Sequence, residues 1–434
     1  MPSDFSDVAH LLRRSGFGGR RSEIESLSAL DWPHLVDHVL DISDNPAVTA
    51  GVPNLDEATT DWGDRYVGMT HYWFERARTV PKPIQEKVAL FWHGVLCSAL
   101  DKVNKHYLMF DQIQLFRTKG MGDLVELYQS MAVQPAMLLY LDNEDNVKGS
   151  PNENFARELM ELFLLGQGHY TEDDVQASAR AWTGHGLNRW DAVPREYVFH
   201  ADRHDNDLKT FMGITNNWNG PDIITHILLG PKQRDAARFI ATKMWSFFAY
   251  PNPDPSVVEV LADALVAGGM RVDALLRAIF LHPEFRSSRA RNALVRSPIE
   301  FTVAAMRHAG LTSDDIDPQW YIGEMGQSMY DPPNVAGWKQ NGYWISSSAM
   351  WAKARFASNL RWQAHERELL ADSPDLGVEQ SVDRALDTFG VFDASQRTRS
   401  SLIDFVTTER ATSRWAEPPG LIFLSLLTPE FQLA

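Results

Sequence analysis

Residues 151–162 read Pro151-Asn152-Glu153-Asn154-Phe155-Ala156-Arg157-Glu158-Leu159-Met160-Glu161-Leu162. Asn152 is a good N-cap, because its side chain can accept a hydrogen bond from the free N–H groups of a first helical turn. At the helical period, one side of the following segment carries Phe155, Leu159, Leu162 and Gly166. The stretch therefore predicts a helix over 153–165.

This helix places a carboxylate among its apolar residues. At about 100° per residue, Glu158 points between Leu162 and Leu165 rather than away from them. A charge on a packed face is costly unless it is paired, hydrogen-bonded or bound to a metal ion. We therefore expect Glu158 to be buried with such a partner, whereas Arg157 lies on the other side and can pair with surface acids.

Helical patterns dominate the chain, and breakers such as Pro81-Lys82-Pro83 and Pro332-Pro333 separate them. They predict a mainly α protein, built as a large multi-helix, bundle-like domain. The expected helices cover 6–14, 22–29, 33–41, 64–79, 84–100, 105–118, 123–132, 153–165, 172–183, 221–229, 233–249, 256–267, 271–281, 298–309, 348–371, 380–389, 395–409 and 420–426.

One β-like patch interrupts the helices at 195–214, where 197–199 and 211–213 could pair as a short hairpin. Residues 1–360 are interpreted as one all-α domain. Because the C-terminal part carries fewer aromatic residues, 361–434 are interpreted as a helical extension packed on that domain.

Composition excludes several classes of function. The 434 residues include 57 acidic and 41 basic side chains, a net charge of −16. Phosphate neutralisation needs clustered Lys and Arg, so no nucleic-acid partner is expected. No apolar run reaches the roughly 18–20 residues that span a bilayer, so no membrane association is expected. The first residues lack the build of a signal peptide, and the single cysteine, Cys97, fits a reducing compartment. We expect a cytoplasmic protein.

The segment 84–100 is apolar nearly all round, which is typical of a buried helix. His93 is therefore expected inside the protein. It is either a core histidine bonded to a carbonyl or carboxylate, or a metal ligand or general base. Glu86 lies on the same side and is its candidate partner. Cys97 is interpreted as an inert buried thiol.

Two irregular segments concentrate candidate functional side chains. In 199–209, His204 and Asp205 could ligate a cation, with Lys209 nearby to bind substrate, or the segment could be an Asx-rich turn. The stretch 331–346 could line a pocket in which Trp338 or Trp344 stacks on a ligand. No nucleophile elbow, phosphate-binding Gly-rich loop, dinucleotide fingerprint or His-Glu-x-x-His motif is present, which disfavours nucleotide and serine-hydrolase chemistry.

At several of these segments the chain resembles a bacterial family known as domain of unknown function 1800. The segments are His10-Leu11-Leu12-Arg13-Arg14-Ser15-Gly16-Phe17-Gly18, Phe91-Trp92-His93-Gly94, Asn152-Glu153-Asn154-Phe155-Ala156-Arg157-Glu158-Leu159, Gly168-His169-Tyr170-Thr171, His204-Asp205 with Lys209, Ala237-Arg238-Phe239 and Pro332-Pro333-Asn334-Val335-Ala336-Gly337-Trp338. The resemblance implies an α-helical fold without an assigned activity. It also implies a neighbouring protein that looks like a sulfatase or alkaline phosphatase.

The chain departs from that family's pattern at two positions. The pattern reads Phe-Trp-His-Gly-His, whereas Val95 stands here in place of the second histidine. It also reads Leu-Thr-Gly-Trp, where this chain has His185 after Thr183-Gly184. If the paired histidines hold a metal ion in relatives, this chain lacks one of the two ligands.

These observations predict an enzyme with one buried polar pocket. Its catalytic and metal-binding residues would be His93, Glu158, His204 and Asp205, and its substrate-binding residues Arg157, Lys209, Trp338 and Trp344. The expected reaction is metal-assisted or acid–base hydrolysis of a polar substrate, for which a sugar-like molecule is one candidate. The candidate cofactor is one divalent metal ion in a weak, oxygen-rich site, and the alternative is no tightly bound metal. One alternative is a non-haem metal oxidoreductase. The other is a non-catalytic helical partner of the sulfatase- or phosphatase-like protein.

Overall fold

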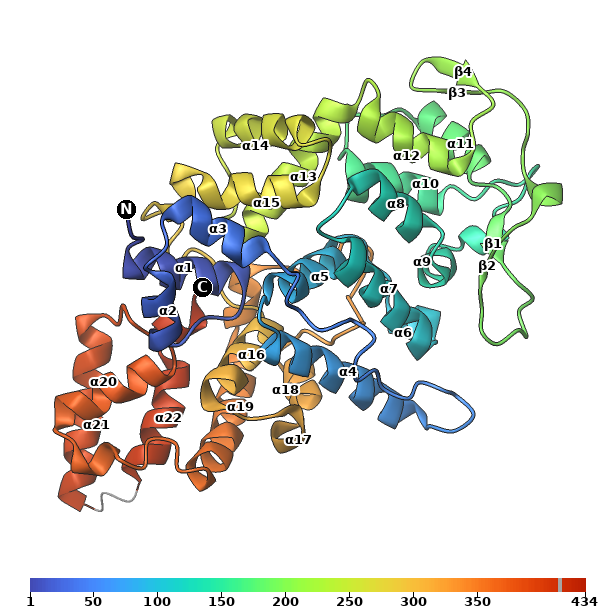
Figure 1. The fold of residues 1–434 in the computed structure, drawn as a ribbon. Coiled ribbons are helices and arrows are strands. Elements are labelled where there is room, and N and C mark those ends of the chain that lie inside the picture. Colours follow the sequence, from blue (N-terminus) through green and yellow to red (C-terminus); the bar gives the residue numbers. More distant parts are fainter. Residues whose placement is uncertain (413–415) are drawn as a thin grey trace.

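The structure is a computed structural model that describes residues 1–412 and 416–434. These residues form a mainly helical protein, as the sequence predicts (Figure 1). The first ten α-helices are α1 (Phe5–Ser15), α2 (Arg21–Leu27), α3 (Trp32–Leu40), α4 (Trp62–Thr79), α5 (Ile84–Val95), α6 (Leu100–Val103), α7 (His106–Lys119), α8 (Leu124–Ala132), α9 (Pro135–Tyr140) and α10 (Asn154–Glu158).

The helices of the second half begin after a π-helix, η2 (Leu159–Leu164). They are α11 (Glu172–Ala181), α12 (Gly220–Leu229), α13 (Gln233–Phe248), α14 (Pro255–Ala267), α15 (Val272–Leu281), α16 (Pro298–Ala309), α17 (Ser313–Ile316), α18 (Pro318–Glu324), α19 (Ser347–Glu366), α20 (Val378–Thr388), α21 (Gln396–Thr412), α22 (Glu417–Leu427) and α23 (Pro429–Gln432). Short 3₁₀ turns lie between them, among them η5 (Asn341–Ile345). Each long predicted helix corresponds to an observed one, whereas the short helices α6, α9, α17, α18 and α23 were not predicted.

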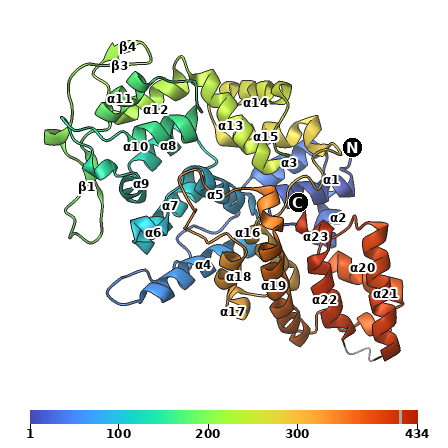
Figure 2. The same ribbon diagram turned by 180° about the vertical axis from the view of Figure 1, so that it is seen from behind.

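Helix α5 lies in the middle of the molecule (Figures 1 and 2). Every residue from Ile84 to His93 is buried. The helix packs on α4 and α7, and Trp92 meets Tyr128 of α8 with ring centroids 5.9 Å apart. The predicted helix over 84–100 is too long, because the chain leaves the helical conformation at Leu96 and a second short helix starts at Leu100.

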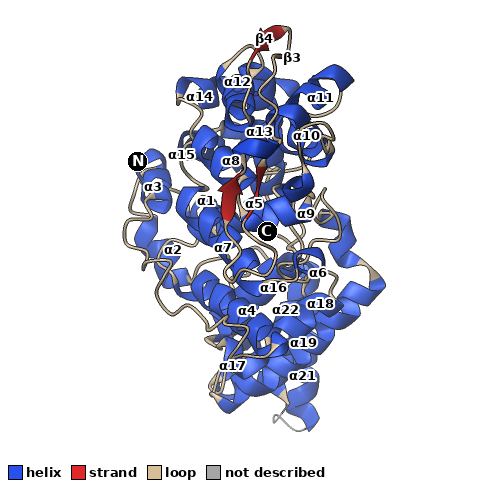
Figure 3. Cartoon of the chain, turned by 90° about the vertical axis from the view of Figure 1, so that its right-hand side faces the viewer, coloured by secondary structure: helices blue, strands red, loops and turns tan. Residues whose placement is uncertain are grey.

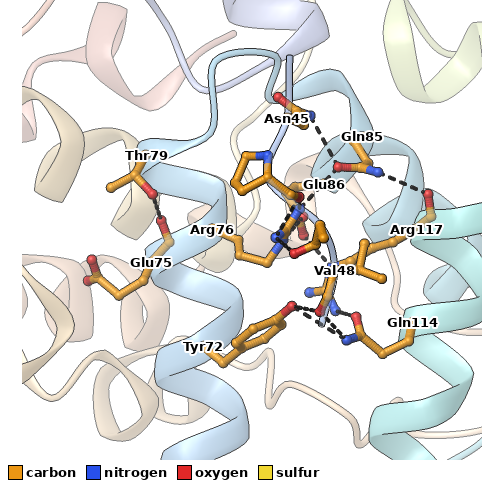
Figure 4. A network of polar contacts seen from close by, with 12 residues as sticks. Asn45, Val48, Tyr72, Glu75, Arg76, Thr79, Gln85, Glu86, Gln114 and Arg117 are labelled. Carbon is orange, nitrogen blue, oxygen red and sulfur yellow. Dashed lines mark hydrogen bonds and ion pairs between the residues drawn. The ribbon is translucent and has the colours of Figure 1, made fainter. Parts of the chain in front are cut away.

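A buried ion network joins α5 to α4 and α7 (Figure 4). Both carboxylate oxygens of Glu86 accept from arginines, Oε1 from Arg76 Nε and Oε2 from Arg117 Nε, each at 2.8 Å. The Glu86 side chain is fully buried. Gln85 extends the network, because its side chain accepts from Arg76 and donates to the carbonyl of Arg117. Three helices are therefore held in one arrangement by a charged core.

The segment 151–165 contains an α-helix, α10, followed directly by a π-helix, η2. The N–H of Asn154 donates to the Asn152 side chain before α10 begins. From Leu159 the chain widens into the π-helix η2, in which the N–H of Leu165 donates to Met160 rather than to Glu161. The wider turn rotates the later residues, so Phe163 and Leu164 are buried and Leu162 is only half-buried. A uniform period of 3.6 residues does not describe this segment.

Strands make up a small part of the fold (Figure 3). β1 (His185–Leu187) pairs antiparallel with β2 (Tyr197–Phe199), and β3 (Lys209–Phe211) pairs antiparallel with β4 (Ile214–Asn216). The predicted hairpin between 197–199 and 211–213 is therefore wrong. Residues 197–199 pair instead with the strand that precedes them, and Phe211 belongs to β3, which pairs with the strand that follows it.

The helices α20, α21 and α22 pack on one another at one end of the molecule (Figure 1), and α22 packs on α19. The predicted extension at 361–434 thus begins inside α19, and the division of the chain at residue 360 stays a prediction. Among the described residues, no helix combines the length and the apolar character needed to cross a bilayer.

Candidate functional site

The C-terminal end of α5 meets the loop 331–346 at two glycines. Gly337 has φ +80°, and a Cβ atom built on it would lie 2.1 Å from the carbonyl oxygen of Gly94. Only glycine fits a backbone crossing this close. The next residue, Trp338, places its ring edge-on against His93, with centroids 5.0 Å apart and planes at 77°. The segments Phe91–Gly94 and Pro332–Trp338 therefore form one structural unit.

A pocket of about 370 Å³ opens beside this unit. Its volume lies within the usual range of small-molecule sites. Its walls come from α5, α13, residues 294–300 and the loop 331–346. The lining residues include Leu90, Phe91, Val95, Lys243, Phe247, Glu300, Ala336 and Trp338. Val95 therefore faces this pocket at the position where the family pattern has its second histidine.

Lys243 is the charged side chain of the α13 wall. It is half-buried, and among the described residues it has no hydrogen-bonding or ion-pair partner. Its Nζ lies 4.9 Å from the centroid of the Phe239 ring. Burial lowers the pKa of the Lys243 ammonium below its ordinary value. A desolvated ammonium without a carboxylate is an unsatisfied charge, and a ligand can satisfy it.

Glu300 supplies a carboxylate to the lining of the same pocket. Lys87 of α5 donates to its Oε1, and the N–H of Ser297 donates to its Oε2 at 2.8 Å. Burial acts to raise the pKa of Glu300, but the ammonium of Lys87 and these hydrogen bonds outweigh it and leave the pKa below its ordinary value. Glu300 is thus an ionised carboxylate at neutral pH, and its charge is balanced by Lys87.

His93 is buried, as predicted, but it has a different environment from the one expected. Its ring contacts those of Trp73, Tyr330 and Trp338, and neither ring nitrogen has a hydrogen-bonding partner in the described part of the chain. Burial lowers the pKa of His93 to about 3. Glu86 is not its partner, because both Glu86 oxygens bind arginines. Cys97 is buried, and burial raises the pKa of its thiol to about 12, as expected of an inert cysteine.

Glu158 is half-buried rather than buried. Among the described residues its carboxylate has no hydrogen-bonding or ion-pair partner, so the structure contains no protein partner of the kind predicted. Burial, together with the nearby carboxylate of Glu161, raises its pKa. Glu158 also affects the Tyr140 hydroxyl. Burial, first of all, raises the pKa of Tyr140 to about 12, and nearby groups that include Cys97, Asp331 and Glu158 add to this effect. Glu158 therefore lies on the side of the molecule where α5 ends.

The His204–Asp205 loop has a structural explanation. His204 is buried, and its Nδ1–H donates to the carbonyl of Thr183 at 2.7 Å. Asp205 accepts from Arg180 Nε at 2.7 Å and from the N–H of Asp207 at 2.9 Å. The second contact forms the Asx turn named above as the alternative. Lys209 donates to the carbonyls of Asp205 and Asp207, which satisfies its ammonium within the loop.

The four residues predicted to bind substrate lie in different environments. Arg157 pairs with Glu153 and Glu172 on the surface, and Lys209 is bonded within its own loop. Trp344 is 2% exposed and packs near Gly326. Only Trp338 of the four lines the pocket.

No hydrogen bond, ion pair or ring contact in the described part of the chain joins His93 to Glu158 or to the His204–Asp205 loop. Within residues 1–412 and 416–434, no group of three or more His, Cys, Asp and Glu side chains is placed to hold a metal ion. The single site of His93, Glu158, His204 and Asp205 stays a prediction. Their catalytic roles stay predictions.

The sequence analysis missed Lys243 and Glu300. Phe239, Lys243 and Phe247 are spaced four apart on α13, so Lys243 lies within an aromatic stripe in the same way that Glu158 lies in an aliphatic one. The helical period that singled out Glu158 among apolar residues also singles out Lys243 on α13. Glu300 stands three residues after Ser297, and the two form a capping box. That pattern is normally structural and gives no sign of the pocket.

The fold and the pocket together define a class, a mainly helical protein in which a glycine-dependent loop and a central buried helix border a cavity. A family model described as protein of unknown function (DUF1800) matches residues 10–433 of this chain. The chain therefore belongs to the DUF1800 family. No curated protein and no solved structure matches the chain. The match also includes the C-terminal helices α20 to α22, beyond the motifs that carry the resemblance.

Proposed function

We propose that the protein is an enzyme that hydrolyses a small organic molecule in the Lys243 pocket by acid–base chemistry. One observation carries the proposal: the pocket is lined by a carboxylate, Glu300, and an ammonium, Lys243, that are not bonded to each other. Pockets with a few convergent titratable groups are the usual sites of such chemistry.

Each of the two groups has a role in this proposal. Glu300 is held ionised and can accept a proton from an attacking water molecule. Lys243 has no protein carboxylate to neutralise it, so its ammonium can stabilise negative charge that develops on a substrate oxygen. The apolar wall of Phe91, Phe247 and Trp338 reduces contact with water and strengthens both interactions.

The test uses a panel of para-nitrophenyl esters and para-nitrophenyl glycosides as substrates. We expect at least one to be hydrolysed by the wild-type protein and its turnover to fall by about 100-fold or more in Glu300→Gln, as is typical when a general base is lost. Gln keeps the capping interaction with Ser297, and thermal unfolding checks that the variant folds.

Two further variants place the reaction in the pocket. Ala336→Phe fills the cavity from the loop 331–346 and should abolish turnover. Ser401→Phe, at an exposed position on α21, is the matched control and should not change it. Turnover that survives both Glu300→Gln and Ala336→Phe would place the chemistry elsewhere. An unreactive panel would overturn hydrolysis as the reaction.

A second candidate function is that of a partner for the sulfatase- or phosphatase-like protein implied by the family resemblance. It is supported by two exposed tryptophans on neighbouring helices, Trp320 of α18 (63% exposed) and Trp351 of α19 (69% exposed). Exposed tryptophans are common in protein interfaces. Co-purification of the two proteins should succeed with the wild type and fail with the double variant Trp320→Ser, Trp351→Ser.

A further inference from the structure

The charges around the pocket do not cancel. Glu300 and Lys87 form an ion pair and neutralise each other. Lys243, which also lines the pocket, has no hydrogen-bonding or ion-pair partner among the described residues. The pocket lining therefore carries one uncompensated positive charge, in a chain whose overall net charge is −16.

The protein behind the Glu300 wall is also positive. Arg14, Arg296 and Lys353 all lie close enough to Glu300 to sense its charge. The side chains of Arg14 and Arg296 are buried, and Nη1 of each has no acceptor. Lys353 is bonded to a neutral group, the side-chain oxygen of Gln432. Glu300 is the acid these cations share with Lys87, so this side of the pocket adds positive potential.

The remaining lining has a polar part, formed by Thr242, Ser246, Asn252, Ser297, Gln327, Gln340 and Asn341, and an apolar part that includes three aromatic side chains. Leu90, Phe91 and Val95 come from α5, Phe247 from α13, and Trp338 from the loop. Phe91 and Phe247 contact each other with ring centroids 5.4 Å apart. A ligand in contact with these apolar side chains presents an apolar body to them, because a polar body would lose its hydrogen bonds to water there without replacement.

We propose that the ligand of this pocket is an amphiphilic organic monoanion, with its anionic head paired to Lys243 and its apolar body against Phe91, Phe247 and Trp338. A single ammonium matches a single negative charge, since Lys acts as a point charge rather than a two-pronged donor. This inference specifies the substrate class of the proposed function. It rests on that proposal only in using the same pocket, and its test measures binding without turnover.

The experiment compares decanoate with 1-decanol, two probes with the same chain length and different charge, by isothermal titration calorimetry. We expect decanoate to bind the wild-type protein about 10- to 100-fold more tightly than decanol, the gain typical of a charged hydrogen bond. In Lys243→Met, which keeps the aliphatic stem, the two probes should bind with nearly equal affinity. Lys243→Arg should retain most of the preference.

The control variant is Lys339→Met, which removes an exposed lysine of the same loop that is bonded to Tyr343. It should leave the preference for decanoate unchanged. Ala336→Phe should weaken the binding of both decanoate and decanol. Ser401→Phe should leave the binding of both unchanged. Circular dichroism and thermal unfolding of each variant establish that it is folded before binding is interpreted.

Two results would overturn the inference. Equal affinity of the wild type for decanoate and decanol would show that the pocket does not recognise the negative charge. A preference that persists in Lys243→Met would assign the charge recognition to another site. Either result leaves ester or glycoside hydrolysis, and its dependence on Glu300, unaffected, so the failure of this inference and that of the proposed function can be told apart.

Discussion

Gly337 lies so close to Gly94 that a Cβ atom on it would be 2.1 Å from the Gly94 carbonyl oxygen. Because of this close approach, the loop 331–346 packs against the end of α5, and the Trp338 ring contacts the His93 ring. Two sequence motifs more than 200 positions apart in the chain thus depend on each other.

Replacement of Gly337 by Ala should displace the loop. The side chain would clash with Gly94 and would require a positive φ, so we expect a loss of about 2–4 kcal/mol in the free energy of unfolding, from overpacking and backbone strain together. Urea unfolding followed by tryptophan fluorescence measures it. The matched control is Gly342→Ala in the same loop, where a Cβ atom would meet nothing within 4 Å. It should cost less than about 0.5 kcal/mol.

His93 should make stability depend on pH. Its pKa is lowered from 6.5 to about 3 by burial. Between these values the unfolded chain binds a proton that the folded protein excludes, so stability falls as the pH drops below 6.5. In His93→Phe this contribution disappears, and the slope of unfolding free energy against pH should decrease by up to about 1.4 kcal/mol per pH unit. The control is Ser401→Phe, which removes no titratable group from the exposed surface of α21 and should keep the wild-type slope.

The Glu86 network should be sensitive to the loss of its carboxylate. In Glu86→Gln, Arg76 and Arg117 keep their buried charges without a counter-charge, and we expect a loss of about 3–5 kcal/mol. Thermal and urea unfolding measure it. Glu259 pairs with Arg234 and Arg238 at the surface, and Glu259→Gln should have a much smaller effect because solvent screens that network. Equal losses of unfolding free energy in Glu86→Gln and Glu259→Gln would show that burial of the Glu86 network does not increase its contribution to stability.

Loss of the Glu158 carboxylate should not destabilise the protein at neutral or alkaline pH, in contrast to loss of the Glu86 carboxylate. It is half-buried without a protein partner, and its pKa is raised by burial and by Glu161. A carboxyl group with a raised folded pKa stabilises the protein at low pH and loses that contribution as the pH rises through the folded pKa. Glu158→Gln should therefore equal or exceed the wild type in stability at pH 8. A marked loss at pH 8 would reveal a partner of Glu158, such as a bound metal ion.

The metal content of the purified protein tests the remaining site prediction. His93 is enclosed by aromatic rings and has no carboxylate ligand beside it. We expect elemental analysis of protein prepared without chelators to give less than one transition-metal ion per chain, and EDTA to leave the melting temperature unchanged. A stoichiometric ion that is lost in His93→Phe would restore the predicted divalent metal cofactor.

The sequence by itself determined the helical class and the positions of the long helices, because apolar spacing and capping residues act within one or two turns. It also determined that His93 is inside, since a helix that is apolar all round must be buried. The widening of the 151–165 helix at Leu159, the strand pairing around 185–216 and the partners of Glu86 were decided by tertiary structure. The partners of Glu86 lie on two other helices, and each strand could pair with more than one nearby segment, so the local period does not select among them.

The pocket was also decided by the tertiary structure. Glu300, Lys243 and Trp338 reach it from three segments whose separate patterns are those of a capping box, an amphipathic helix and an irregular loop. Periodicity shows which face of a helix is apolar, but not which other face it will meet. The charge that remains uncompensated at Lys243 exists only when the folded chain brings these walls together and pairs Glu300 with Lys87 instead.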